Sequence, residues 1–228
     1  MNLASKSAIA TAALGGVGLT GAYAGGLFDK STTPQQTTIV KTTFKKILEA
    51  EGFTILDTSQ NNQDWNTVLV EYKKATERSF TGSKQANKLE NELRSDCEKA
   101  LVQNYEENGN YRENVNYKRA IQWCVKKETM NKVLENGKMR ILKFDATSNE
   151  TAEQGLLQKK LNKLSEENNK GFNALKKAVN PTITTSDANS IETLKKGCEA
   201  LQINTLETIN DKFLDNFYLA KEFCYVDK

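Results

Sequence analysis

Two stretches of the 228-residue chain are nearly the same: residues 93–101 read LRSDCEKAL, and residues 194–201 read LKKGCEAL. Each copy has a leucine four residues before a cysteine, a glutamate directly after the cysteine, and then an Ala-Leu pair. These apolar positions recur at three- and four-residue steps, which is the spacing of one buried face of a helix. The chain therefore contains a repeated helix with a cysteine on its apolar face.

The repeat extends on both sides of this helix. Upstream, Trp65-x3-Leu69-x2-Tyr72 matches Leu157-x3-Leu161-x2-Leu164. Downstream, positions 100 residues apart keep apolar or aromatic character: Tyr117 with Phe217, Ala120 with Ala220, Trp123 with Phe223, and Cys124 with Cys224. Such a repeat indicates a duplicated supersecondary unit. We expect an all-α fold with two pseudo-repeated small helical modules, residues 39–126 and 151–228, joined by a connector over residues 127–150.

The four cysteines occupy matched positions in the two copies. Four cysteines allow three pairings, and the repeat favours one disulfide within each module, Cys97 with Cys124 and Cys198 with Cys224. A bridge across such a loop stabilises by roughly 3–4 kcal/mol, and bridges persist in exported proteins. Two alternatives stay open. The cysteines could be reduced and packed as small apolar residues, or they could bind zinc, although structural zinc sites usually draw ligands from close pairs.

Apolar spacing predicts four helices in the first module. They are expected over about residues 39–50, from an N-cap at Asp64 onward, over 84–105 and over 111–125. Gly52 should end the first helix, and residues 53–56 should form a strand or an extended connector. The expected inward faces hold Trp65, Leu69 and Tyr72; Leu89, Leu93, Cys97, Ala100 and Leu101; and Tyr117, Ala120, Ile121 and Cys124.

The N-terminus predicts export. Residues 7–28, SAIATAALGGVGLTGAYAGGLF, carry no charge and are long enough to span the roughly 30 Å hydrocarbon core as a helix. Residues 1–28 are therefore expected to be a transmembrane anchor, or a signal peptide cleaved after Ala24 because residues 22–24 fit the A-x-A pattern. A buried soluble helix is the third alternative. Residues 29–38, DKSTTPQQTT, are expected to be a polar linker.

The same apolar segment contains a nucleotide-binding pattern by coincidence. Residues 16–21 satisfy G-x-G-x-x-G. That fingerprint requires a preceding strand and an acidic residue about 20 positions later, whereas Ala-rich sequence precedes it and Lys41 stands near the acidic position. We interpret it as part of the export segment.

Several of these features together resemble one protein family. The Gly/Ala-rich start, W-x3-L-x2-Y, L-x3-C and the late aromatic-cysteine pairs resemble the paralogous proteins of haemotropic mycoplasmas, which are cell-wall-less parasites of red blood cells. The resemblance covers most of the chain. The second copy departs from it at Leu157 and Phe223, where the first copy has tryptophan, and both changes keep apolar bulk. The family implies an exported, antigenically variable surface protein and supplies no catalytic residue.

The composition excludes several kinds of chemistry. The chain has no histidine, which rules out a Ser-His-Asp triad, a Cys-His pair and histidine-ligated metal. A net charge of +3, with lysine doublets that have acids nearby, argues against nucleic acid as a partner. The acid pairs Glu106-Glu107 and Glu166-Glu167 fit solvated helix surfaces, because neighbours in sequence do not face each other on a helix.

These observations lead to one expected function. We expect a non-catalytic, exported protein displayed on the extracellular side of the cell membrane, with residues 7–28 in the membrane, or secreted if it is cleaved after Ala24. It would serve as an antigenic or host-interaction module, without a cofactor, and its partner would be a host or cell-surface protein. Binding would use polar faces or the loops near residues 145–155 and 180–190. A secreted ligand carrier, or a hydrolase without a recognisable motif, is the alternative.

Overall fold

The computed structural model describes residues 41–60, 62–106, 110–165, 173, 175 and 191–228. The chain divides into two units, residues 1–38 and 39–228, and all described residues belong to the second. The export segment and the polar linker predicted for residues 1–38 lie outside the described residues. Within the described ranges, no helix is both long enough and apolar enough to cross a membrane.

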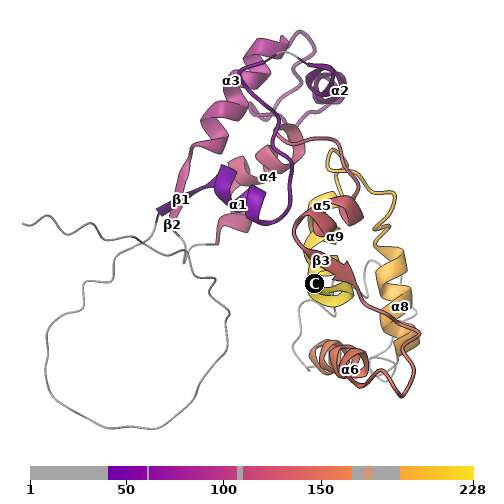
Figure 1. The fold of residues 1–228 in the computed structure, drawn as a ribbon. Coiled ribbons are helices and arrows are strands. Elements are labelled where there is room, and N and C mark those ends of the chain that lie inside the picture. Colours follow the sequence, from indigo (N-terminus) through magenta and orange to yellow (C-terminus); the bar gives the residue numbers. More distant parts are fainter. Residues whose placement is uncertain (1–40, 61, 107–109, 166–172, 174, 176–190) are drawn as a thin grey trace, which may run out of the picture. The chain divides into compact units, whose positions relative to one another are not determined.

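The elements of the first half are short helices and two short strands that lie side by side (Figure 1). In chain order they are β1 (Lys41–Thr43), α1 (Phe44–Ala50), α2 (Gln63–Tyr72), α3 (Glu90–Leu101), β2 (Asn104–Glu106), the 3-10 turn η1 (Tyr111–Glu113) and α4 (Val115–Trp123). The second half holds α5 (Met130–Asn136), β3 (Met139–Ile141), α6 (Thr151–Ser165), α8 (Ile191–Ala200), α9 (Phe213–Leu219), the π-helical turn η3 (Ala220–Cys224) and β4 (Tyr225–Asp227).

The all-α prediction is wrong. The described residues include four strands, which form two antiparallel two-stranded sheets: β1 pairs with β2, and β3 pairs with β4. In the first sheet Thr42 lies opposite Tyr105, and in the second Arg140 lies opposite Val226. Each strand has three residues, which is too few for the alternating pattern that reveals a strand in a sequence. The fold is mainly helical with two small sheets.

Helix starts also differ from the expected ones. Residues 41–43 form β1, so α1 begins only at Phe44, after Thr43 as the N-cap. The N-cap of α2 is Asn62, whose side chain accepts a hydrogen bond from the Trp65 N–H at 3.2 Å, and Asp64 lies in the first turn instead. Asn62 and Asp64 are both favoured N-cap residues, so spacing alone did not separate them.

The two longer predicted helices are shorter in the structure. The helix expected over 84–105 begins at Glu90 and ends at Leu101, and Tyr105 belongs to β2. The helix expected over 111–125 is a 3-10 turn followed by α4, which begins after an Asn114 N-cap. Leu89, expected on the buried stripe of α3, is 59% exposed, whereas the rest of that stripe is buried as predicted.

The repeat is longer than the predicted modules, because the expected connector over residues 127–150 contains α5 and β3. Residues 43–49, TFKKILE, match residues 129–135, TMNKVLE. Thr43 and Thr129 are both N-caps, and each accepts a hydrogen bond at 3.4 Å from the N–H three residues on. Thus α5 repeats α1, α6 repeats α2, α8 repeats α3, and α9 with η3 repeats α4.

Equivalent backbone hydrogen bonds close both repeats. The Leu56 N–H donates to the Cys124 carbonyl at 3.0 Å, and the Leu142 N–H donates to the Cys224 carbonyl at 2.9 Å. Leu56 ends the stretch 53–56, for which the sequence predicts a strand or an extended connector. In the structure this stretch forms one isolated bridge, between Ile55 and Val125. In each repeat the end of the last helix therefore returns to the segment that precedes the second helix.

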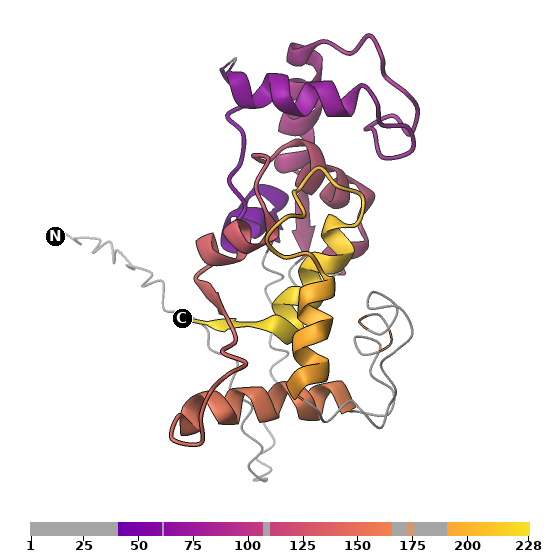
Figure 2. The same cartoon turned by 90° about the vertical axis from the view of Figure 1, so that its right-hand side faces the viewer.

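The ends of α1 and α5 meet where the two repeats pack together, as both views show (Figure 1, Figure 2). Gly52 follows α1 with a φ of +95°, and it lies so close to the second repeat that an added Cβ would stand 2.1 Å from the Val133 carbonyl oxygen. A Cβ on Gly137 would stand 2.9 Å from the Glu51 carbonyl oxygen. The expected helix-ending role of Gly52 is confirmed, and the same residue allows a close contact between repeats.

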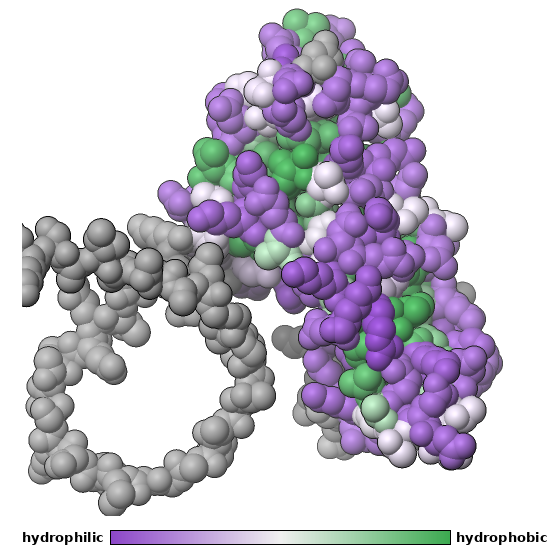
Figure 3. Space-filling model, viewed as in Figure 1, coloured by the Kyte–Doolittle hydropathy of each residue, from purple (hydrophilic) through white to green (hydrophobic). Residues whose placement is uncertain are grey.

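One apolar core runs through both repeats. Its buried residues come from every described helix, and Phe53 of the first repeat contacts Phe213 and Phe217 of the second, with ring centroids 6.1 and 5.0 Å apart. On the face drawn in Figure 3, hydrophilic residues cover most of the described surface and apolar residues gather in small patches. A shared core means that the repeats stabilise each other.

Candidate functional site

The cysteines pair in the structure as the repeat predicts. Cys97 of α3 is bonded to Cys124 at the end of α4, with an S–S distance of 2.10 Å. Cys198 of α8 is bonded to Cys224 of η3, with an S–S distance of 2.02 Å. All four residues are buried. Each bridge therefore ties the third helix of a repeat to the end of its fourth helix.

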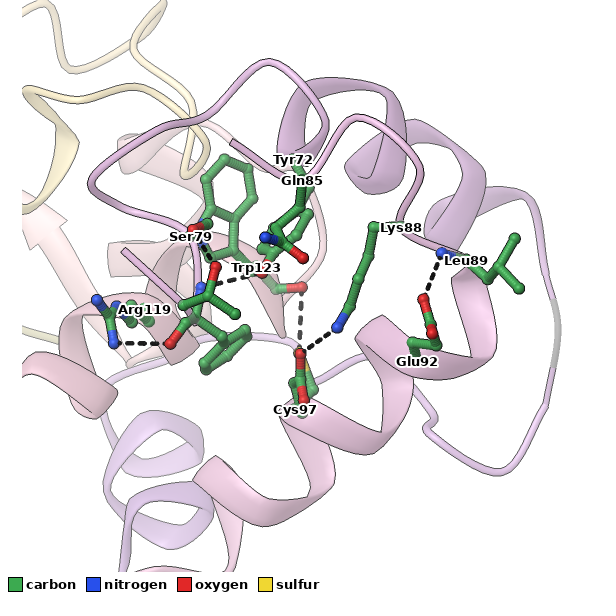
Figure 4. A network of polar contacts seen from close by, with 12 residues as sticks. Tyr72, Ser79, Gln85, Lys88, Leu89, Glu92, Cys97, Arg119 and Trp123 are labelled. Carbon is green, nitrogen blue, oxygen red and sulfur yellow. Dashed lines mark hydrogen bonds and ion pairs between the residues drawn. The ribbon is translucent and has the colours of Figure 1, made fainter. Parts of the chain in front are cut away.

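Aromatic residues that occur only in the first repeat hold the loop between α2 and α3 (Figure 4). The Trp123 indole N–H donates to the Arg78 carbonyl at 2.8 Å, and the Tyr72 hydroxyl accepts from the Phe80 N–H at 2.9 Å. Arg119 donates to the Phe80 carbonyl at 3.1 Å. The equivalents of Trp123 and Tyr72 are phenylalanine and leucine, which are apolar but have no polar group to form these bonds.

A buried carboxylate lies at the junction of the repeats. Glu51 follows α1, is 7% exposed, and is the position that corresponds to Gly137 in the second repeat. Its carboxylate accepts hydrogen bonds from the hydroxyls of Tyr117 at 2.6 Å and Tyr218 at 3.1 Å, and it forms an ion pair with Lys221 at 3.3 Å. Tyr111 donates a longer bond of 3.4 Å. A buried charge requires such partners, and they come from both repeats.

The phenols of this cluster stay protonated. Burial raises the pKa of Tyr117, and its neighbours Tyr218 and Glu51 raise it further. Burial raises the pKa of Tyr218 as well, and the nearby Glu51 carboxylate adds to that effect. Both phenols are therefore hydrogen-bond donors throughout the physiological pH range. The cluster is suited to joining the two repeats and to fixing Tyr218 in place.

Tyr218 also borders a hollow of about 690 Å³ along the outer side of α9. Arg112 of η1 covers the ring of Tyr218, with 4.0 Å between the guanidinium carbon and the ring centroid. Residues of both repeats line this hollow, including Lys118 of α4 and Gln202 after α8. The hollow is a depression of the surface that is partly open to solvent.

Sequence reasoning did not single out Glu51, Arg112 or Tyr218. Glu51 could have been found by aligning residues 43–52 with 129–138, because a charged residue then stands opposite Gly137. Arg112 and Tyr218 carry no comparable signal, since they meet only in the folded chain. Of the predicted acid pairs, Glu106 ends β2, and Glu107, Glu166 and Glu167 lie outside the described residues. The segment near 145–155, expected to be a binding loop, contains the start of α6 at Thr151. The second expected binding loop, near 180–190, lies outside the described residues.

Replacing Tyr117 with phenylalanine should weaken the junction. The change removes a 2.6 Å bond to a buried carboxylate, and hydrogen bonds to charged groups contribute about 1.5–3 kcal/mol. We expect the free energy of unfolding, measured by urea titration, to fall by about that amount. Tyr105→Phe is the matched control, because no hydrogen bond of the Tyr105 hydroxyl occurs within the described residues, and it should change stability by less than about 0.5 kcal/mol. Equal effects of the two variants would contradict a role for the cluster.

The fold and site define a class of protein: a disulfide-bonded tandem repeat, mainly helical, with one core and one polar junction. Comparison with protein-family models, with curated proteins and with solved structures finds no match to the chain. The function is therefore inferred from the sequence and the structure of this chain.

Proposed function

We propose that the chain is a non-catalytic, exported protein, displayed on the surface of a cell-wall-less bacterium, that acts as an antigenic or host-interaction module. The observation that carries the proposal is the pair of disulfides at equivalent positions of the two repeats. Disulfides form and persist mainly outside the reducing cytosol. The uncharged, Gly/Ala-rich residues 7–28 supply a route of export, and the resemblance to the paralogous mycoplasma proteins agrees with it.

The partner that fits this proposal is a protein on a host cell or on the same cell surface. The described surface is mainly hydrophilic on the face of Figure 3. Charges are numerous and nearly balanced, with 32 basic and 29 acidic residues in the whole chain. Such a surface favours contacts that depend on the arrangement of charges rather than on net attraction.

Surface proteolysis of intact cells tests the proposal. A soluble protease, added to cells that express the full chain, should remove it while a cytosolic marker protein stays intact. The chain and the marker should both be degraded once the cells are lysed. If the chain resists protease in intact cells but not after lysis, it is located inside the cell and surface display is wrong. A chain found only in the medium, and shortened by 24 residues, would assign it to secretion.

A further inference from the structure

The hollow along α9 combines charges of both signs. Its cationic lining residues are Arg112, Lys118 and Lys212, and its acidic ones are Glu113, Asp215 and Glu222. Three acids among three cations leave the lining without the net positive charge that attracts a polyanion such as nucleic acid. A ligand that carries both a carboxylate and a cation matches this lining better.

Three of these charged residues, Arg112, Lys212 and Asp215, form no ion pair within the part of the chain that the structure describes. Lys118 pairs with Glu113 at 2.9 Å, and Glu222 pairs with Lys163 at 2.7 Å. Within the described ranges, no carboxylate lies within 4.0 Å of the Arg112 guanidinium, and no cation lies within 4.0 Å of the Asp215 carboxylate. Asp215 is therefore the acid of the hollow that is best placed to meet a charge from outside, and of the two such cations Arg112 is the one held against an aromatic ring.

Arg112 is held in a geometry that suits a carboxylate. Its guanidinium lies over the ring of Tyr218, and the Tyr218 hydroxyl is itself fixed by Glu51 at 3.1 Å and Tyr117 at 3.1 Å. Stacking uses the face of a guanidinium and leaves N–H groups along its edge for an acceptor. An arginine fixed in this way loses less side-chain entropy when it binds a carboxylate through two parallel hydrogen bonds.

The length of the hollow along α9 and η3 favours an extended ligand. Its lining follows α9 and η3 from Lys212 to Glu222, and residues of η1, of α4 and around the end of α8 complete it. Asp215 and Glu222 lie about two turns apart along α9 and η3, so the acids are spread along the hollow. Gln202 adds an amide group to the lining, and an amide group can hydrogen-bond a peptide backbone.

We propose that this hollow binds a peptide segment of mixed charge, with a carboxylate of the peptide on Arg112 and a cationic side chain of the peptide beside Asp215. The carboxylate comes either from an acidic side chain or from the end of the peptide chain. This inference goes beyond surface display, because it concerns the purified chain and holds wherever the cell places it.

The test uses the full oxidised chain, immobilised, and pools of random heptapeptides that are acetylated and amidated. In the first pool every peptide contains one glutamate and one lysine, in the second glutamine replaces the glutamate, and in the third glutamine replaces the lysine. Retention of the first pool should exceed that of the second by about tenfold, since one charge-assisted pair is worth about 1.4 kcal/mol or more. Retention of the third pool should also fall. A fourth pool, like the second but with a free terminal carboxylate, shows which source of carboxylate is used.

Variants of the protein link binding to the hollow. Arg112→Gln should reduce retention of the first pool to the level of the second, and Asp215→Asn should remove the preference for lysine. Lys84→Gln makes a similar charge change at an exposed residue outside the hollow and should leave retention unchanged. Thermal melts establish that each variant is folded, and Asp215→Asn provides the test if Arg112→Gln is not. Equal retention of all pools, or full retention by both folded variants, would overturn the proposal.

Discussion

Gly52→Ala should lower the free energy of unfolding by more than about 4 kcal/mol, which is exceptional for a point mutant. The new Cβ would stand 2.1 Å from the Val133 carbonyl oxygen and 2.4 Å from the Gly137 backbone nitrogen. These are backbone atoms, so a side chain cannot move aside to make room. The two repeats would have to separate locally, which would expose part of the shared core. Thermal unfolding followed by circular dichroism should show a melting temperature lower by about 10 °C or more.

Two other residues with a positive φ, Gly82 and Lys138, show how much of this effect comes from the close contact and how much from backbone strain. Gly82 also has a positive φ, of +70°, but an added Cβ would meet no atom closer than 3.8 Å. Gly82→Ala should therefore cost only about 1 kcal/mol, the penalty for a left-handed residue. Lys138, the equivalent of Gly52 in the second repeat, already carries a side chain at a φ of 62°. If Gly52→Ala were no worse than Gly82→Ala, the described packing of the repeats would be wrong.

Removing either disulfide should have the next largest effect. The bridges join residues 27 and 26 positions apart, and loops of that length imply about 3–4 kcal/mol of stabilisation per bridge from restriction of the unfolded chain. The double variants Cys97→Ser with Cys124→Ser, and Cys198→Ser with Cys224→Ser, should each lose about that much free energy of unfolding in guanidinium titrations.

The two double variants serve as controls for each other. Because the two bridges close loops of almost equal length in equivalent repeats, the two double variants should lose similar amounts. Reduction of the unmodified protein should destabilise it more than either variant. An unchanged stability after loss of one pair would mean that those cysteines are not bridged.

The sequence predicted the repeat and the cysteine pairing, because both depend on spacing that survives duplication. Leu93-x3-Cys97 and Leu194-x3-Cys198 keep the same helical face, and α3 and α8 indeed present both cysteines to the core. The start of the second repeat was missed, although TFKKILE and TMNKVLE are visibly related. Equivalent residues of the two repeats are 86 positions apart at this start and 100 positions apart near the last helix, because the loops of the repeats differ in length. A search that uses one fixed separation therefore does not find the match.

The strands and the junction could not be predicted for a different reason. A three-residue strand such as β1 is defined by its partner β2, which lies far away in sequence, and no local pattern encodes that pairing. The Glu51 cluster gathers residues from the end of α1, η1, α4, α9 and η3, up to 170 positions apart. A buried glutamate next to Gly52 looks like any solvated helix end until the tertiary fold brings the phenols to it.

The most direct test of the whole account is the intact mass of the protein recovered from its own cells, after alkylation of free thiols in denaturant, with and without prior reduction. We expect that no cysteine is alkylated without reduction and that all four are alkylated after it, since Cys97–Cys124 and Cys198–Cys224 leave no free thiol. Four alkylated cysteines without reduction would contradict the disulfide-bonded repeat and remove the main support for export.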